Sequence, residues 1–449
     1  MAELSPMEKV ISLAKRRGFI FQSGEIYGGL QGFWDFGPLG VELKNNIKKS
    51  WWKRFVQGRA NVVGQDAAIV TNPTVWQKSG HVGGFADTLV ECKKCHHRFK
   101  ADDLADTKKC PDCGGTLTEA KQFNTMFKTF VGPTEDSASV AYLRPETAQN
   151  IFVNFELVRQ SMRLKVPFGI GQIGKAFRNE ITPGNFIFRS REFEQMELEY
   201  FINPKDDEKE FKAWVEASMQ WFLDLGIKKD NLRFFEQPKS ELAHYSKATT
   251  DIEYNFPFSS KGGSASGGDK GWSELMGIAN RTDFDLKAHG LSYRDEVSNE
   301  TFVPYVIEPS AGVDRAALAF LIDAYTEISG GRSTTTESNK EQEVVLRLHK
   351  ELAPIKVAVL PLSKKDEVSG PAKEIAQTLR QHWTIQYDDI ASIGRRYRRQ
   401  DEIGTPYCVT YDFDSNTDKQ VTVRDRDTMT QERIPVGDLV EYLGKKLSS

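Results

Sequence analysis

The chain has 449 residues, too many for one ordinary hydrophobic core, so we expect two or three domains. Its formal net charge of −3 argues against a non-specific nucleic-acid coat, although a local basic patch can still hold a structured RNA. The apolar stretches are too short for a membrane helix, and the N-terminus carries no basic-then-apolar export signal, so we expect a cytoplasmic protein.

The first three quarters of the chain combine amphipathic helices with long extended segments. Residues 5–17 predict a helix that starts with a capping box, and 41–56 predict a second helix with an apolar residue at every fourth position. Two further helices are expected at 206–225 and 314–326. Extended segments are expected at 168–201, 251–258 and 272–280. The last two flank a Gly/Ser-rich spacer at 259–271, and successive strands with few helices between them favour an antiparallel sheet.

A polar stretch at 330–342 separates this region from a different pattern. The expected strands there lie at 355–362, 384–388, 407–413 and 420–423, and the expected helices at 372–382, 395–400 and 438–446. Alternating strands and helices indicate a separate α/β domain of about one hundred residues. Its basic cluster at 395–399 is interpreted either as a solvated helix face or as an RNA contact, and Cys408 as a buried apolar residue.

The strongest local motif spans 177–197. It begins Phe177-Arg178-Asn179-Glu180 and, after a short Pro/Gly loop, returns through an aromatic and acidic segment. An Arg and a Glu two residues apart on a strand point to the same face, where one can grip a phosphate and the other can accept from an amine. Taken alone, the pattern is also that of a salt-bridged surface hairpin.

A second motif lies at 307–317. It predicts an extended segment that turns at Gly312 into a helix with Asp314 and Arg315 in its first turn. A helix N-terminus favours anions through its unpaired N–H groups and its dipole, and Arg315 adds a mobile cation. In isolation this motif is also a capped helix with an ion pair in its first turn.

Four of the five cysteines form two CxxC pairs: Cys92, Cys95, Cys110 and Cys113. Two such pairs separated by fourteen residues predict a structural zinc site with four thiolate ligands. A site that has lost its metal, or a redox pair, is the alternative. With four protein ligands no position would remain open for catalysis, and we expect His96 and His97 to be bystanders.

Taken together and in this order, the two longer motifs resemble the second and third signature motifs of class II aminoacyl-tRNA synthetases. Asn72 to Trp76, preceded by a helix, resembles the first motif, which serves the dimer interface in that class. Further segments resemble the homodimeric, bacterial-type glycyl-tRNA synthetases, and they lie at 37–44, 79–81, 144–149, 243–247 and 277–283. The resemblance runs from about residue 7 to 447.

This resemblance implies an α+β fold with three parts. The catalytic domain would be an antiparallel sheet flanked by helices, formed by 1–90 and 121–350. A small zinc-ribbon-like insertion would occupy 91–120, and an α/β anticodon-binding domain would occupy 351–449. The implied activity is glycine–tRNA ligation by a homodimer, with ATP, glycine and tRNA(Gly) as partners and with no membrane association.

The resemblance also implies roles for individual residues. Arg178, Glu180 and Arg315 would be catalytic, with Arg178 on the α-phosphate of ATP and Glu180 on the adenine amino group. The implied ATP-binding residues are Arg178, Asn179, Glu180, Phe188, Arg191, Phe193, Glu274, Leu275, Gly312 and Arg315. The implied glycine-binding residues are Glu146, Phe193, Gln195, Glu197, Glu308, Ser310 and Gly312. Glu274 would help to hold Mg²⁺, and we expect no catalytic histidine, with His81 and His244 structural or substrate-orienting.

Three alternative identities are weighed against this one. A class II synthetase for another small or polar amino acid is disfavoured by the set Glu146, Glu197, Glu308 and Ser310. A catalytically inactive paralogue that binds RNA or acts as a polymerase accessory subunit predicts the loss of Arg178, Glu180 or Arg315, and all three are present. An isolated zinc-ribbon transcription factor would leave the other motifs unexplained.

Overall fold

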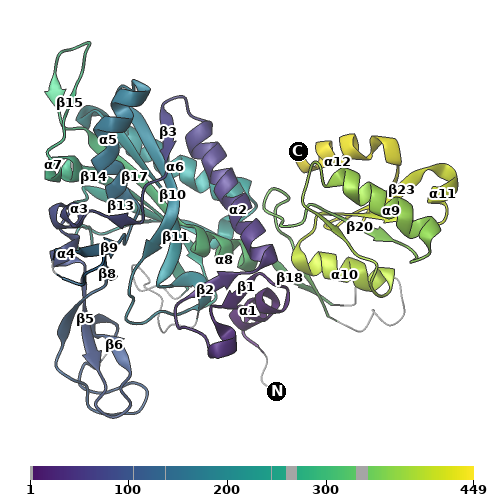
Figure 1. Ribbon diagram of the computed structural model, residues 1–449, viewed down its shortest axis with the longest axis horizontal. Helices are drawn as coiled ribbons and strands as arrows, with labels where there is room; N and C mark the ends of the chain where they lie inside the picture. Colours follow the sequence, from purple (N-terminus) through teal and green to yellow (C-terminus); the bar gives the residue numbers. More distant parts are fainter. Residues whose placement is uncertain are drawn as a thin grey trace.

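The computed structural model describes residues 4–104, 106–136, 138–243, 245–258, 271–329 and 342–448. The spacer at 259–270, His244 and the polar stretch at 330–341 lie outside the described residues. Figure 1 shows a large body with long strands, a small projection that carries β5 and β6, and a C-terminal body beside them. None of the described helices combines the length and the apolar character that crossing a bilayer requires.

A seven-stranded sheet forms the centre of the large body. In spatial order its strands are β12 (Leu232–Glu236), β13 (Ala248–Asn255), β14 (Trp272–Thr282), β17 (Tyr305–Gly312), β11 (Glu192–Ile202), β10 (Phe168–Phe177) and β3 (Val62–Gln65). Neighbours run antiparallel except β10 and β3, which are parallel. The expected antiparallel sheet is confirmed, and the strands around the spacer pair with each other as a hairpin.

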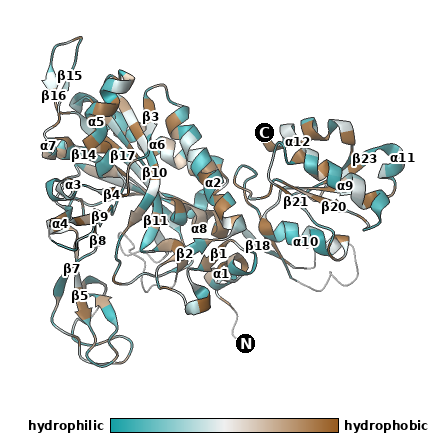
Figure 2. Ribbon diagram, in the orientation of Figure 1, coloured by the Kyte–Doolittle hydropathy of each residue, from teal (hydrophilic) through white to brown (hydrophobic). Residues whose placement is uncertain are grey.

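Helices cover both faces of this sheet. One face packs on α1 (Pro6–Arg16), α2 (Pro38–Trp52), α6 (Asp207–Asp224) and α8 (Val313–Ala324). The opposite face packs on α5 (Ala148–Met162) and α7 (Phe284–Ala288). Along β11, Met196 and Leu198 belong to the first core whereas Phe201 belongs to the second, because successive side chains of a strand point to opposite faces. Figure 2 shows the brown, apolar segments concentrated along these strands and helices.

Two expected helices follow from local sequence chemistry. Ser5 caps α1, because its hydroxyl accepts from the backbone of Glu8 and the Glu8 carboxylate accepts from the Ser5 backbone, which confirms the capping box. The apolar stripe of α2 (Leu43, Ile47 and Trp51) is no more than 1% exposed. The helix begins at Pro38, three residues before the expected start, and its last turn widens into the π-helical η2 (Lys53–Gln57).

The expected extended segment from 168 to 201 is interrupted by the Pro/Gly loop foreseen after Glu180, but the expectation that 186–188 is also extended is wrong. Between β10 and β11 the chain forms a loop with a 3₁₀ turn, η4 (Phe186–Phe188). Asn185 and Phe186 both have positive φ, which a strand cannot contain. The turn places the Phe188 ring 4.9 Å from that of Phe258 and so anchors the loop to the neighbouring hairpin.

Short elements surround the large body. The short helices are α3 (Pro73–Lys78), α4 (His81–Gly84), η1 (Glu25–Tyr27), η3 (Ala101–Asp103), η5 (Pro204–Asp206) and η6 (Lys229–Asn231). The two-stranded sheets are β1 (Ile20–Gln22) with β2 (Trp34–Phe36), β15 (Tyr293–Arg294) with β16 (Thr301–Phe302), and β18 (Tyr325–Ile328) with β19 (Glu343–Leu346). The three-stranded sheets are β4 (Val70–Thr71), β9 (Val140–Leu143) and β8 (Lys128–Phe130), and β6 (Arg98–Lys100), β5 (Ala86–Glu91) and β7 (Lys121–Asn124).

The C-terminal body has its own sheet and core. Its strands, in spatial order, are β21 (Ile385–Tyr387), β20 (Val357–Pro361), β22 (Tyr407–Tyr411), β23 (Gln420–Asp425) and β24 (Gln431–Pro435). Its helices are α9 (Asp366–Leu379), α10 (Ile393–Ile403), α11 (Ser415–Asp418), η8 (Val436–Asp438) and α12 (Leu439–Ser448). The expected α/β pattern is confirmed, but β24 was not expected. The helix expected from 372 begins at Asp366, because its first turn buries Val368 in the core even though Pro371 lies inside the helix.

Candidate active site

A cavity of about 370 Å³ opens beside the central strands β11, β14 and β17. Twelve of the residues expected at the site line it: Glu146, Arg178, Glu180, Phe188, Phe193, Gln195, Glu197, Glu274, Glu308, Ser310, Gly312 and Arg315. They come from segments far apart in the chain and meet because β11 pairs with β17 and β17 pairs with β14. The cavity has an acidic side and a side that carries arginines.

Glu197 is fixed at the acidic side by hydrogen bonds from two directions. The backbone N–H of Thr147 donates to its Oε2 at 3.0 Å, and the Thr147 hydroxyl donates to the same atom. The Ser310 hydroxyl donates to Oε1 at 2.9 Å from β17. The side chain is 2% exposed, so these bonds hold a buried carboxylate in one orientation.

Glu146 lies beside Glu197 in the cavity wall and is paired with a histidine. The His81 Nε2 atom is 3.4 Å from Glu146 Oε2, and Ser79 contacts the other ring nitrogen at 2.8 Å. Burial alone would raise the pKa of Glu146, but its interactions with His81, Arg281 and Arg178 lower the pKa below its usual range. His81 thus contacts the site through Glu146 and does not itself line the cavity.

Glu308 completes the acidic side and is paired with Arg281. An Arg281 N–H donates to Glu308 Oε2 at 2.8 Å, and the same guanidinium makes two hydrogen bonds to Asp285. Burial raises the pKa of Glu308, with the nearby Glu197 and Glu146 acting in the same direction and Arg281 against them. Arg281 was not assigned a role from the sequence. The available signal was a charged residue within the apolar run that forms β14.

The arginine side of the cavity presents two guanidinium groups held by aromatic rings. Arg178 lies 5.4 Å from the centre of the Phe193 ring and donates to the Pro145 carbonyl at 3.0 Å. Arg315 lies 4.5 Å from the centre of the Phe188 ring and 3.2 Å from a Glu274 carboxylate oxygen. A guanidinium group can neutralise phosphate oxygens, so this side of the cavity suits a phosphate group.

Glu274 and Asp251 place two carboxylates near Arg315. They lie on the neighbouring strands β14 and β13, and a Cβ on Gly277 would stand 3.5 Å from an oxygen of each. Burial and then the charge of Glu274 raise the pKa of Asp251 to about 7. Two neighbouring carboxylates offer the oxygen ligands that a divalent cation prefers. The residues therefore fit the expected Mg²⁺, and Asp251 was not foreseen.

Three residues expected to contact ATP do not line this cavity. Asn179 and Arg191 line an adjacent cavity of about 460 Å³ next to the β5–β7 sheet, and Glu180 borders both cavities. The Arg191 side chain donates to the backbone carbonyls of Glu180 and Gln31. Leu275 has a side chain 1% exposed within the core. The sequence predicted no role for Arg189, Gln237 and Tyr245, which also line the main cavity.

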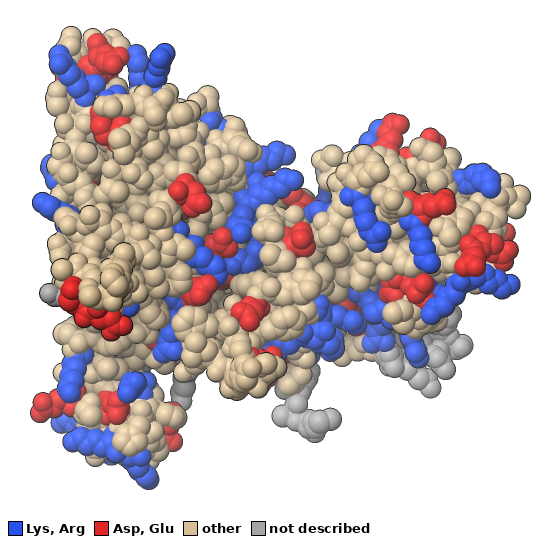
Figure 3. Space-filling view, viewed as in Figure 1, with Lys and Arg blue, Asp and Glu red and all other residues tan. Residues whose placement is uncertain are grey.

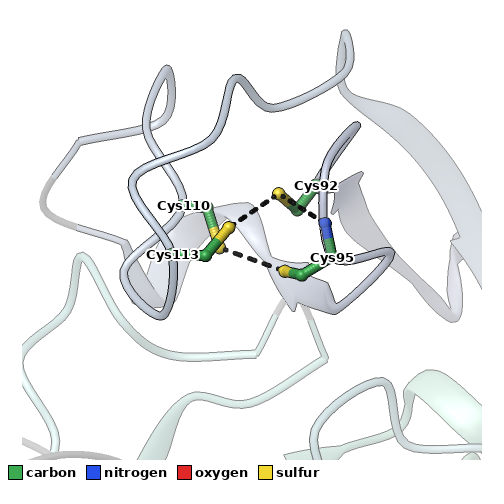
Figure 4. A group of neighbouring side chains, drawn as sticks. All are labelled: Cys92, Cys95, Cys110 and Cys113. Atoms are coloured by element: carbon green, nitrogen blue, oxygen red, sulfur yellow. Dashed lines mark hydrogen bonds between the residues drawn. The ribbon is translucent and has the colours of Figure 1, made fainter.

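The four cysteines of the CxxC pairs meet at the tip of the projection (Figure 4). Cys92 Sγ lies 3.5 Å from Cys113 Sγ, and Cys95 Sγ lies 3.7 Å from Cys110 Sγ. Disulfide sulfurs are about 2 Å apart, whereas ligands of a tetrahedral zinc ion with Zn–S bonds of about 2.3 Å are roughly 3.8 Å apart. The cluster therefore has the dimensions of a zinc site. His96 and His97 point to Glu91 and Asp112 instead.

Most arginines of the basic cluster at 395–399 make hydrogen bonds or ion pairs within the C-terminal body. Arg396 is 4% exposed and donates to backbone carbonyls, including that of Asp388 at 3.3 Å. Arg399 donates to the Asp388 carboxylate. Arg395 is exposed on α10. Neither expected interpretation describes the whole cluster, because part of it holds α10 against the sheet.

The sheet, the cavity and the separate C-terminal body are those of a class II aminoacyl-tRNA synthetase. Residues 131–325 match the family model described as the tRNA synthetase class II core domain (G, H, P, S and T), and 356–446 match the anticodon binding domain. Among curated relatives, the "Glycine--tRNA ligase" of Thermobifida fusca is 52% identical and covers 100% of this chain and 99% of its own. Those of Alkaliphilus oremlandii (52%, 100% of both chains) and Streptomyces coelicolor (53%, 98% of both) are similar. The chain belongs to the glycine–tRNA ligase family.

Proposed function

We propose that this protein activates glycine with ATP and transfers the glycyl group to the 3′ end of tRNA(Gly). The observation that carries this proposal is the meeting of three carboxylates and two arginines around one cavity. The acidic side suits an ammonium group, and the arginine side suits phosphate. A carboxylate substrate that bears its ammonium next to the reacting carbon fits between them.

In the first step a glycine carboxylate oxygen attacks the α-phosphorus of ATP. A new O–P bond forms, the bond to the β-phosphate oxygen breaks, and pyrophosphate leaves with that electron pair. The nucleophile is already an anion, so the step needs positioning and charge neutralisation rather than a general base. Arg178 and Arg315 would neutralise the phosphate oxygens, and the Phe193 ring, which lies beside Arg178, would stack on adenine.

In the second step the 3′-terminal ribose hydroxyl of tRNA attacks the glycyl carbonyl carbon. The ester bond forms, the mixed anhydride C–O bond breaks, and AMP leaves with that electron pair, while the hydroxyl proton passes to a phosphate oxygen of the departing AMP. The protein holds the carbonyl in place through the ammonium group. Glu197, fixed by Thr147 and Ser310, is the most rigid of the acids that would do so.

Selection of glycine follows from the shape of the acidic side. Glu146, Glu197 and Glu308 surround the position of the ammonium group and occupy the space into which a side chain would extend. Steric exclusion can reject every larger amino acid, whereas a pocket built for a larger one would lose only about 1–3 kcal/mol per missing methylene. The proposed site therefore needs no editing domain.

We place the Mg²⁺ that accompanies ATP at Glu274 and Asp251. When bound there, a divalent cation would neutralise phosphate charge. Glu274 must leave the ion pair with Arg315 for this purpose, which would release the Arg315 guanidinium towards the phosphates. Binding of the nucleotide with its cation would thus change the position of the Arg315 side chain.

We propose that the cysteine cluster holds a structural zinc ion in an insertion spanning 91–120. Closed thiolate sites stabilise small domains, and such a site could supply on the order of 10 kcal/mol towards folding. Gly115 fits this role, because a Cβ there would stand 2.9 Å from Cys92 Sγ. The catalytic part would then comprise 1–90 and 121–350, and the anticodon-binding part 351–449.

We further propose a homodimer whose interface includes the β4–β9–β8 sheet. This sheet and its margins expose several apolar side chains, namely Ile69 (37%), Val70 (42%), Phe130 (41%) and Val131 (61%). They lie next to α3, whose start resembles the first class II motif. A second copy of the chain would bury these side chains. The cytoplasmic location is a separate prediction, made from the sequence.

The tRNA would reach both bodies of the protein. On the face drawn in Figure 3, Lys and Arg side chains gather over α2 and where the large body meets the C-terminal body. Such a band suits the phosphate backbone of a nucleic acid in spite of the overall charge of −3. The match of 356–446 to an anticodon binding domain gives the far end of this path.

Amino-acid-dependent ATP–pyrophosphate exchange with each of the twenty amino acids tests the proposed function. We expect exchange with glycine alone, followed by charging of tRNA(Gly) when the tRNA is added. Exchange driven by another amino acid, or none by glycine, would overturn the assignment of the acidic side. Exchange without charging would limit the proposal to the first step.

A further inference from the structure

Glu199 is a buried carboxyl group behind the acidic side of the cavity. It lies on β11 two residues after Glu197, so both side chains point to the same face of the sheet. Its side chain is 0% exposed, and neither carboxylate oxygen has a hydrogen-bond partner among the described residues. Because an ionised carboxylate without partners is strongly disfavoured in the interior, this group requires a proton or a partner.

The register of β11 and β17 sets Glu199 opposite Glu308. Glu197 pairs with Ser310 and Tyr200 with Ile307, so position 199 falls across from position 308. One oxygen from each of Glu197, Glu199 and Glu308 lies within 4.8 Å of the others. Two carboxyl groups this close in a buried site disfavour each other's ionised form, so at least one of them tends to keep its proton.

The surrounding charges favour a proton over a metal ion at this position. Both oxygens of Glu197 already accept hydrogen bonds, from Thr147 and Ser310. Glu308 already accepts from Arg281, whose remaining bonds go to Asp285. Burial and then Glu308 raise the pKa of Glu199 well above its usual range, with Glu197 and Asp285 acting in the same direction and Arg281 against them. A metal ion would find these carboxylates engaged, whereas one proton needs only Glu199 and Glu308.

We propose that Glu199 retains a proton, donates it in a hydrogen bond to Glu308, and so positions Glu308 to receive the ammonium group of glycine. Glu199 is a positioning residue because it does not line the cavity and acts through Glu308. The inference rests on the function proposed above. It accounts for the stability of an acidic cluster that would otherwise gather too much negative charge in one buried place.

Two substitutions separate hydrogen bonding from simple packing. Glu199→Met fills the space without a donor, and Glu199→Gln keeps an N–H donor but cannot ionise. In ATP–pyrophosphate exchange we expect Glu199→Met to raise the KM for glycine roughly tenfold or more, the effect of losing a hydrogen bond to a charged group. The KM for ATP should stay unchanged. Glu199→Gln should restore the glycine KM close to that of the unaltered protein.

A purely structural role would lower the thermal midpoint and alter both KM values together, without rescue by glutamine. If Glu199→Gln is impaired as strongly as Glu199→Met, a hydrogen-bond donor at this position is not sufficient and the proposal is overturned. The same holds if Glu199→Met leaves the glycine KM unaltered.

Infrared difference spectroscopy provides a second test, which does not depend on enzymatic activity. The spectrum of the unaltered protein at neutral pH should contain the C=O stretch of a protonated carboxyl group that shifts in D₂O and disappears in Glu199→Gln. Absence of that band contradicts the proposal. If the band is present while glycine supports no exchange, the proposed function fails and the proton assignment stands, so the two failures are distinguishable.

Discussion

The Ser310 hydroxyl donates a 2.9 Å hydrogen bond to Glu197 Oε1, across two paired strands and 113 positions of sequence. The bond joins the strand that follows Arg178 to the strand that precedes Arg315, so Glu197 and the two arginines are carried by neighbouring strands of one sheet. Glu197 is thereby fixed before any substrate arrives, which is what selective binding of a small ammonium group requires.

Replacing Ser310 by alanine removes this donor and little else. We expect the KM for glycine in ATP–pyrophosphate exchange to rise about tenfold, because a hydrogen bond to a charged group contributes about 1.5–3 kcal/mol. The KM for ATP should change little. Ser161→Ala on the exposed end of α5 serves as the control. An unaltered glycine KM in Ser310→Ala would show that Glu197 does not depend on this bond.

Replacing Arg178 by alanine removes a guanidinium from the cavity without emptying a core position. We expect the rate of glycine-dependent exchange to fall by at least about 100-fold, the usual cost of losing one preorganised electrostatic contact to a transition state. The circular dichroism spectrum should be unchanged. Arg294→Ala, on the exposed hairpin β15–β16, should leave the rate intact. Normal exchange by the Arg178 variant would refute the role given to it.

Replacing Cys92 by serine tests the cysteine cluster. We expect the zinc content of the purified protein to fall and the thermal midpoint of the insertion to drop, because a closed site needs all four thiolates. His97→Ala is a matched control, since His97 is exposed nearby and contacts Asp112 rather than the sulfurs. Equal zinc in the unaltered protein and the Cys92 variant would exclude Cys92 as a ligand.

Lys44 links α2 to the acids around the start of α8. Its ammonium lies 2.8 Å from Asp314 and 3.1 Å from Glu194. Burial opposes the charge on Lys44 and on Glu194, yet the neighbouring Lys44 and Lys48 lower the pKa of Glu194. We expect Lys44→Met to reduce the free energy of unfolding by about 3–5 kcal/mol at neutral pH in urea titrations, because it leaves buried carboxylates uncompensated.

The pH dependence of that stability has a definite sign. The folded pKa of Glu194 lies below its ordinary value of 4.5, so its contribution is present above pH 4.5 and is lost as the pH falls through the folded pKa. Because the folded pKa of Lys44 is raised above its ordinary value of 10.5, its contribution to stability is lost only as the pH rises through that pKa in alkaline solution. Lys44→Met should therefore lose less stability on acidification than the unaltered protein, and Lys49→Met, exposed on the same helix, should behave as the latter. Equal acid sensitivity in both variants would contradict the linkage.

The sequence predicted the members of the cavity better than their electrostatics. Arg178, Arg315 and the three substrate-side acids belong to recognisable segments, so their convergence could be expected before any geometry was known. Arg281 and Glu199 could not be placed in this way, because their importance depends on which residue lies opposite them across β14, β11 and β17. Strand register is decided by the whole sheet and not by the local sequence.

Local patterns also failed where tertiary contacts override them. The apolar run at 186–188 suits a strand, but two positive φ angles and packing on the neighbouring hairpin make it a turn. The arginines at 395–399 suit an exposed helix face, yet the Arg396 guanidinium is buried among backbone carbonyls. Charge content alone does not reveal which charged groups remain at the surface.

A crystal structure with a non-hydrolysable analogue of glycyl-adenylate tests the account most directly. It should show the ammonium group within hydrogen-bonding distance of Glu146, Glu197 and Glu308, with Arg178 on the group that replaces the phosphate. An analogue bound with its ammonium group away from all three acids, or with Arg178 turned out of the cavity, would contradict the assignment of this site.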